Sequence, residues 1–197
     1  MNETARSTTL RHARRDDADV LAELVNHAGE GLPVHLWSGM ADPGQTAWDV
    51  GRARAARDEG SFSYRNATLV EFKGRAAGCF IGYGIGKDPE PITRDIPQMF
   101  VPLTELENIA LNTWYVNVLA VLPPFRNLGL GSTLLRVAER TARYLCKPAM
   151  SIIVSDANSG ARRLYERVGY REVASRPMVK ETWVNDGEDW LLLRKDL

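Results

Sequence analysis

The spacing of apolar residues along the chain predicts helices and strands in an irregular alternation. Near the start, a short strand from Leu10 is followed by a helix, because acidic residues at 16, 17 and 19 precede apolar residues at 20, 21, 24 and 25. Residues 29–44 lose this periodicity amid Gly and Pro, which predicts a loop, and a second helix should run from about Trp48 to near Gly60.

The middle and end of the chain show clearer patterns. Two β-prone runs at 64–72 and 77–85 flank a short glycine-containing link and predict a hairpin. The most strand-like stretch is 113–122, which Pro123 and Pro124 terminate. The remaining predicted elements are a helix at 129–144, a strand at 150–154, a helix at 159–168 and closing strands at 170–173 and 190–193. This order predicts an α/β fold with a mixed sheet.

Residues 87–112 separate the hairpin from the predicted central strand. Prolines at 89, 91, 97 and 102 each remove a backbone donor, so this segment should hold neither a central strand nor a long helix. We treat it as an insertion into a single domain that spans residues 1–197, a length that one hydrophobic core can serve.

Composition narrows the classes of partner. Lys plus Arg and Asp plus Glu number 25 each, so no overall field attracts nucleic acid or an anionic membrane. Cys79 and Cys146 lack zinc-type spacing and the three histidines are scattered, so we expect no metal site and two packed free thiols. Residues 1–8 are polar and the longest apolar run, at 116–122, is far shorter than the ~20 residues that cross a bilayer, which favours a cytoplasmic location.

One segment has the form of an anion-binding turn. A strand containing Leu119, Ala120 and Val121 leads into Arg126-Asn127-Leu128-Gly129-Leu130-Gly131-Ser132 and then into a helix. The first turn of a helix offers unpaired backbone N–H groups and a partial positive charge, which together hold a phosphate. Two nucleotide motifs are excluded, since no lysine follows Gly131 as in a P-loop, and Leu134 occupies the place of the third glycine of a dinucleotide fingerprint.

At these residues the chain resembles the GNAT acetyltransferase superfamily, whose Arg/Gln-x-x-Gly-x-Gly/Ala motif is matched in full by Arg126 to Gly131. A second family element follows, made of Asn158, Ala161, Leu164-Tyr165-Glu166 and Gly169-Tyr170. The resemblance implies the GNAT acyl-CoA N-acyltransferase fold. That fold has a mixed central sheet of about six to seven strands flanked by helices, splayed between the central strand and the next.

The resemblance also implies roles for particular residues. Acetyl-CoA would be the co-substrate, with its pyrophosphate on the turn from Arg126 to Gly131 and its pantetheine arm along Leu119 to Val121. Further contacts would come from Ser132, Asn158, Ala161 and Tyr165. The acetyl group would pass to a primary amine of a small molecule or protein by direct attack in a ternary complex. Tyr165 would protonate the leaving thiolate. We expect a monomer or homodimer.

The general base is left open by the sequence. Asn117 stands on the central strand where relatives often carry an acidic residue, and an amide cannot take up the proton. Glu105, Glu107 and Glu71 are the candidates, although a glutamate is more often an ordinary surface carboxylate than a catalytic base. We also considered His35, beside Trp37.

Alternatives remain open for the activity as a whole. Because Asn117 cannot act as a base, a non-catalytic acyl-CoA-binding or regulatory module stays an alternative. An acyl group longer than acetyl is a further possibility. Acceptor specificity is assigned to the loops at 29–44 and 87–112, which carry no recognisable motif.

Overall fold

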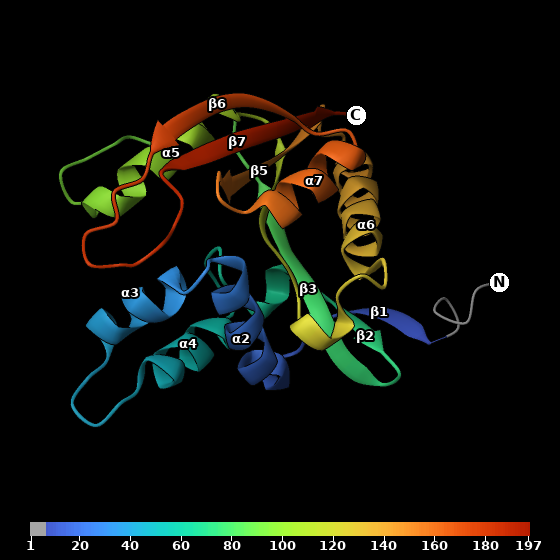
Figure 1. Cartoon of the computed structure of the whole chain (residues 1–197), viewed down its shortest axis with the longest axis horizontal. Helices are drawn as coiled ribbons and strands as arrows, with labels where there is room; N and C mark the ends of the chain where they lie inside the picture. The colour runs from blue at the N-terminus through green and yellow to red at the C-terminus, as the bar shows by residue number, and fades with distance from the viewer. Residues whose placement is uncertain (1–6) are drawn as a thin grey trace. The chain divides into compact units, whose positions relative to one another are not determined.

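The computed structural model describes residues 7–197 and contains a 7-stranded sheet in the order β1-β2-β3-β4-β5-β7-β6 (Figure 1). The strands are β1 (Thr8–His12), β2 (Ala67–Phe72), β3 (Arg75–Gly84), β4 (Trp114–Val121), β5 (Ala149–Ser155), β6 (Arg171–Pro177) and β7 (Asp189–Asp196). β4 and β5 are parallel, whereas the pairs β1·β2, β2·β3, β5·β7 and β6·β7 are antiparallel. The predicted mixed sheet is therefore confirmed.

Six α-helices accompany these strands in the described part of the chain. They are α2 (Ala18–Ala28), α3 (Leu32–Met40), α4 (Ala47–Ala55), α5 (Val101–Ile109), α6 (Leu130–Tyr144) and α7 (Ser159–Arg167). The described chain divides into two compact units, the first comprising the chain up to Gly82 with Val118–Arg136, and the second comprising Tyr83–Asn117 with Val137–Leu197. Each unit is considered by itself.

The first unit is built around a core under α2, α3 and α4, which lie together in Figure 1. Fully buried residues of α2 meet residues of three strands there; the set is Leu21, Leu24, Leu69, Ile81, Val118 and Ala120. Trp37 of α3 stacks on Phe62 with ring centroids 5.9 Å apart and meets Trp48 edge-on at 6.1 Å. These rings close the core on the side of α3 and α4.

The helix α3 corrects the predicted loop at 29–44. Pro33 occupies its first turn, where a missing N–H removes no helical hydrogen bond, and Gly31 adopts the left-handed conformation just before the helix begins. The Gly and Pro residues that suggested a loop thus lie mainly at the ends of a nine-residue helix. Burial of Leu32 and Trp37 supplies the packing that stabilises it.

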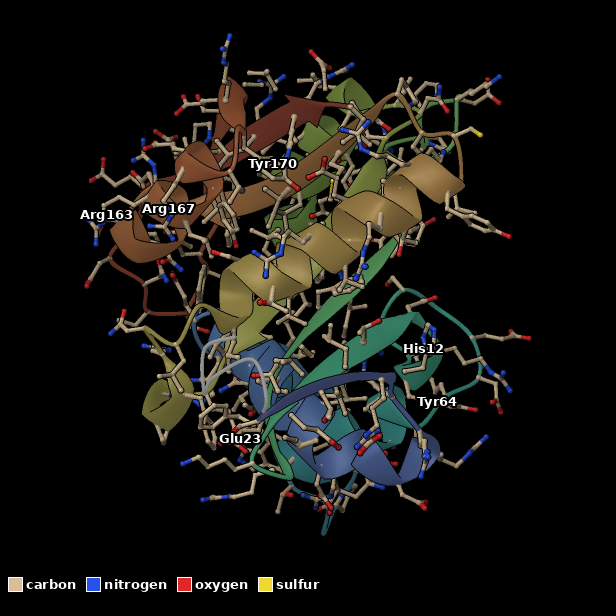
Figure 2. The ribbon with its side chains drawn as sticks, turned by 90° about the vertical axis from the view of Figure 1, so that its right-hand side faces the viewer. His12, Glu23, Tyr64, Arg163, Arg167 and Tyr170 are labelled. Carbon is tan, nitrogen blue, oxygen red and sulfur yellow. The ribbon has the colours of Figure 1, made fainter. Side chains whose placement is uncertain are left out.

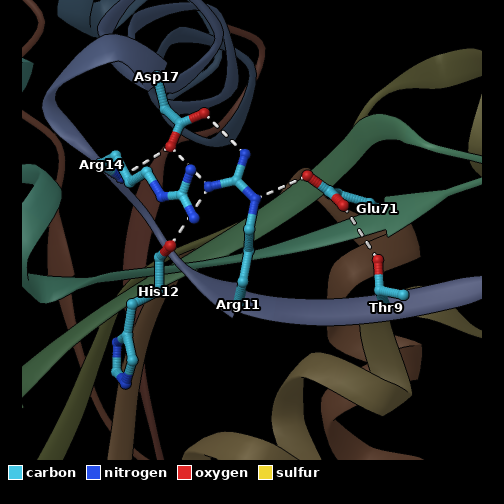
Figure 3. Close-up of polar contacts among 6 residues, drawn as sticks. All are labelled: Thr9, Arg11, His12, Arg14, Asp17 and Glu71. Atoms are coloured by element: carbon cyan, nitrogen blue, oxygen red, sulfur yellow. Dashed lines mark hydrogen bonds and ion pairs between the residues drawn. The ribbon is translucent and has the colours of Figure 1, made fainter.

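A polar network ties β1 to its neighbours in the first unit (Figure 3). The Arg11 guanidinium donates two hydrogen bonds to Asp17, at 2.7 and 2.8 Å, and one to Glu71 at 2.6 Å. Glu71 also accepts a hydrogen bond from the Thr9 hydroxyl at 3.0 Å. These bonds to Arg11 lower the pKa of both carboxyl groups.

The second unit combines the three-stranded array β5-β7-β6 with α5 and α7. Figure 1 shows α5 beside β6 and β7. Leu106 and Ala110, one helical turn apart, are buried against Leu192 of β7. This nine-residue helix lies inside the predicted insertion, where the expected absence of a long helix and of a central strand holds but a short helix was not foreseen.

Two predicted elements begin or end at residues other than those expected. The helix expected to reach Gly60 ends at Ala55, and the strand expected from Tyr64 begins at Ala67 after a 3₁₀ turn. The hairpin turn is as predicted, with Lys73 and Gly74 both at positive φ, 51° and 72°.

The two thiols differ from each other. Cys79 is fully buried, and burial raises its pKa to about 12, whereas Cys146 is exposed, so the prediction of a packed thiol is wrong for Cys146. Within residues 7–197 no helix combines the length and apolar character that a bilayer crossing requires. The residues 1–6 used in the expectation about a secretory signal lie outside the described part.

Candidate active site

The turn before α6 leaves the amides at the N-terminus of that helix without helical partners. Asn127 and Gly129 both adopt left-handed backbone, with φ of 62° and 77°, and this brings the chain from the end of β4 into the helix. The amide of Thr133 bonds to the carbonyl of Gly129 at 3.0 Å. The amides of residues 130–132 come before this first helical bond and so have no partner within the helix.

This turn is also accessible. Residues 126–129 are exposed, and a Cβ added at Gly129 would meet no atom within 4 Å. The Arg126 guanidinium donates to the carbonyl of Val121 at 3.2 Å, which keeps its positive charge beside the end of β4. Leu130 is buried and anchors the helix start, while Ser132 is half-buried. An exposed helix N-terminus beside a positive charge has the features that favour binding of an anion.

The strand leading into this turn is only briefly paired with β5. The ladder consists of Trp114 with Met150 and Tyr115 with Ser151, although β4 runs on to Val121. This is the splay that the family resemblance implied. Along the final stretch, Leu119 and Val121 are half-buried and Ala120 is buried in the core of the first unit.

In the second unit, α7 carries the other predicted cofactor residues. The Asn158 side chain caps the helix by accepting a hydrogen bond from the amide of Ala161 at 3.1 Å. Tyr165 is buried, and its ring centroid lies 5.9 Å from that of Tyr170. In Figure 2, Arg163 and Arg167 lie on the outer side of the same helix, and both are exposed, whereas Tyr165 is buried.

Glu107 is set apart from the other candidate bases by its surroundings. Its side chain is half-buried on α5, and no hydrogen bond or ion pair within residues 7–197 engages its carboxylate. Burial, and to a smaller extent the negative charge of Glu90, raise the pKa of Glu107 to about 7. The charge of Glu107 acts in turn on Tyr83 and Tyr115, whose rings meet edge-on at 5.5 Å.

The other candidate bases are held in ion pairs or lie elsewhere. Glu105 accepts a 2.5 Å hydrogen bond from Arg176 of β6, and Glu71 belongs to the Arg11 network of the first unit. His35 lies on α3 in the first unit, in a helix and not in the predicted loop. Asn117 is half-buried on β4. Of the three glutamates, Glu107 is the one whose carboxylate no cation neutralises in the described residues, and its pKa is raised.

Buried hydroxyl groups fix α5 to the start of β4 and β5. The Thr113 hydroxyl donates to the carbonyl of Ala110, the C-cap residue of α5, at 2.7 Å. Because its proton is used there, the 2.6 Å contact with Ser151 must have the Ser151 hydroxyl as donor. The segment that carries Glu107 is thereby held in a defined position within the second unit.

Sequence reasoning did not foresee that Tyr83, Tyr115 and Glu90 surround Glu107. A period-two reading of the central strand would have placed Tyr115 on the same face as Asn117, and Tyr83 lies between two glycines at the end of a strand. Nothing in the pattern at 87–112 pointed to Glu90. No group of three or more His, Cys, Asp or Glu side chains in the described part of the chain could hold a metal ion.

Comparison with known proteins gives a consistent result. The sequence model of the acetyltransferase (GNAT) family matches residues 36–170. Among curated proteins, none matches this chain significantly. Among solved structures, an acetyltransferase shares 21% identity over 95% of this chain and 98% of its own, with a TM-score of 0.65.

Two further structures have the same fold. Arabidopsis thaliana Naa50, solved in complex with the bisubstrate analogue CoA-Ac-MVNAL, is 17% identical over 97% of this chain and 99% of its own, with a TM-score of 0.57. The ribosomal-protein-S18-alanine N-acetyltransferase from Escherichia coli is 16% identical over 96% and 93%, with a TM-score of 0.58. At these identities the likeness concerns the fold, and the family match covers more than half of the chain. The chain therefore belongs to the GNAT family of acetyltransferases, enzymes whose co-substrate is acetyl-CoA.

Proposed function

We propose that this chain transfers the acetyl group of acetyl-CoA directly to a primary amine of a small molecule or protein within a ternary complex. The observation that carries this proposal is the half-buried Glu107 carboxylate, which no cation neutralises and whose pKa is raised to about 7. A base must accept a proton from an ammonium group near neutral pH, and a carboxylate of raised pKa does so better than an ordinary one.

The proposed binding of acetyl-CoA rests on the N-terminus of α6. The amides of Leu130, Gly131 and Ser132, together with Arg126, would hold the pyrophosphate, and Asn127, Leu128 and Gly129 shape the turn. Backbone groups of Leu119 to Val121, where β4 is not laddered to β5, would pair with the pantetheine amides. Asn158 and Ala161 are the contacts proposed on α7.

The reaction would then replace the thioester bond of acetyl-CoA with an amide bond to the acceptor. Glu107 takes a proton from the acceptor ammonium, directly or through a water, and the neutral amine forms a C–N bond with the acetyl carbonyl carbon. As the C–S bond breaks, the Tyr165 hydroxyl gives its proton to the leaving thiolate, the second proton that the nitrogen loses on becoming an amide restores the Tyr165 hydroxyl, and Glu107 releases its proton to solvent. Tyr115 interacts electrostatically with both Glu107 and Tyr165, which supports their assignment to one reaction centre within the second unit.

Glu107→Gln tests the base, because it keeps the shape of the side chain and removes its ability to accept a proton. We expect kcat/KM to fall by at least about 100-fold in a thiol-release assay, while acetyl-CoA affinity is unchanged. Glu105→Gln is the matched control on the same helix and should lose far less activity. In the wild type, kcat/KM should rise with pH through about 7 as Glu107 loses its proton.

The acceptor panel should contain polyamines, aminoglycosides, amino acids and peptide N-termini. Peptides are included because one structural neighbour is named for a ribosomal-protein alanine acceptor. Full turnover by Glu107→Gln would reject the base. Tight acetyl-CoA binding by the wild type without turnover of any amine or any acyl-CoA would favour the non-catalytic module instead. A monomer or homodimer and a cytoplasmic location stay predictions.

A further inference from the structure

The loop preceding α5 is fastened to the helix by one side chain. The Asn108 side-chain amide donates to the carbonyl of Glu90 at 2.9 Å, and its oxygen accepts a hydrogen bond from the amide of Glu90 at 2.8 Å. Both bonds use the backbone of Glu90, so they fix the position of that residue whatever its side chain is. Asn108 directly follows Glu107 in the helix, and the clamp therefore places Glu90 next to the proposed base.

We propose that Asn108 is a positioning residue: by clamping the backbone of Glu90, it holds a second carboxylate beside Glu107 and so tunes the base through charge. This inference rests on the proposed function for its catalytic meaning, but its physical content concerns these three residues alone. Asn108 touches no reacting atom in this scheme and acts through Glu90.

The other groups around Glu107 are neutral, paired or apolar, which leaves Glu90 as the charge that acts on it. From β3 and β4 it interacts with Tyr83 and Tyr115, whose pKa values are raised by burial, so both rings are neutral at the pH where Glu107 titrates. On the β6 side, the positive charge of Arg176 is paired with Glu105 at 2.5 Å. From β7 the contact with α5 is apolar, through Leu192.

The direction of the effect follows from these charges. Burial is the larger cause of the raised pKa of Glu107, and the like charge of Glu90 adds to it. Removing the charge of Glu90 should therefore lower the pKa of Glu107 by a few tenths to about one unit, with the effect of burial left in place. Releasing the clamp should act in the same direction, because an unfastened loop lets the exposed Glu90 move away from Glu107.

The experiment follows the Glu107 side-chain carboxyl by ¹³C NMR across a pH titration, with the resonance assigned by its loss in Glu107→Gln. The variants are Glu90→Gln, which keeps the backbone clamp, Asn108→Ala, and the two combined. Asp95→Asn removes one charge from the same exposed loop and serves as the control. Thermal melts accompany each variant, and the acid limb of kcat/KM is measured in parallel.

We expect Glu90→Gln and Asn108→Ala each to shift the titration of Glu107 to lower pH, and the double variant to match Glu90→Gln alone. Asp95→Asn should leave the titration unchanged. A merely structural role for Asn108 would predict a loss of rate at every pH and an additional shift in the double variant.

Two results would overturn the proposal. If Glu107 titrated at the same pH in Glu90→Gln as in the wild type, Glu90 would have no electrostatic effect on it. This result would reject the proposal even if Asn108→Ala failed to fold. Equal shifts from Asn108→Ala in the presence and absence of Glu90 would show that Asn108 acts by another route. Failure of the proposed function is read separately, as full turnover by Glu107→Gln, because the NMR titration needs no activity.

Discussion

Gly51 on α4 is packed against Trp37, and this contact reverses the usual effect of a Gly to Ala change. At an open helix position the change stabilises a protein by about 1 kcal/mol, because Gly is the poorer helix former. At Gly51, however, an added Cβ would lie 2.5, 2.6 and 2.9 Å from ring carbons Cζ3, Cε3 and Cη2 of Trp37. The ring would have to retreat by roughly an ångström to restore normal contact.

The ring has little room to retreat. Trp37 is only 3% exposed, stacks on Phe62 and is met edge-on by Trp48, so its displacement disturbs two further rings. Overpacking a well-filled core costs about 1–3 kcal/mol. With the helix-propensity gain subtracted from the upper part of that range, Gly51→Ala should destabilise the protein by about 1–2 kcal/mol. For a chain of this size that corresponds to a melting temperature about 2–8 °C lower.

Urea unfolding followed by far-UV circular dichroism measures the difference. Gly39→Ala is the matched control, because a Cβ at that position of α3 meets nothing within 4 Å, and it should leave stability unchanged or raise it. A second test is Trp37→Leu, which should make the Gly51→Ala change harmless in its background. If Gly51→Ala alone proved as stable as the wild type, the steric reasoning would be refuted.

Three further outcomes can be measured. Replacing Arg11 with Met should lower the free energy of unfolding at pH 7 by about 1–3 kcal/mol. Because Arg11 lowers the folded-state pKa of its two carboxylate partners, wild-type stability should decline as pH falls below about 4.5, and the variant should show a flatter profile. Arg126→Glu should weaken acetyl-CoA binding at least about tenfold by isothermal titration, whereas the same change at the exposed Arg140 of α6 should not. Tyr165→Phe should reduce kcat by about 10- to 100-fold with the dissociation constant of acetyl-CoA kept, and unchanged turnover would remove its acid role.

The elements with a strong local pattern could be read from the sequence, and those whose stability depends on distant packing could not. The helix at 130–144 and the strand at 114–121 carry their own periodicity and stop signals, so their prediction was confirmed. The two missed helices share one feature, a proline in the first turn, at Pro33 and Pro102. Proline is compatible with that position, but in segments rich in Pro and Gly it is easily interpreted as a helix breaker.

The candidate site divides in the same way. The turn that begins at Arg126 is a local motif, so its residues could be named in advance. The three candidate glutamates looked alike, because the cations that pair with two of them are far away in the chain. Glu71 is 60 residues from Arg11 and Glu105 is 71 residues from Arg176. Only a folded structure reveals which carboxylate is left without a cation.

The way α5 is fastened on several sides has a consequence for how chain length can vary in related sequences. A single residue inserted or deleted inside the helix turns everything beyond it by about 100°, which would present a neighbour of Glu107 to the two tyrosines in its place. The exposed stretch at 91–95 lies before the helix begins, so gaining or losing residues there leaves the helix in phase. Homologues should therefore tolerate gaps on the amino side of Val101 and keep a constant spacing from there to Thr113.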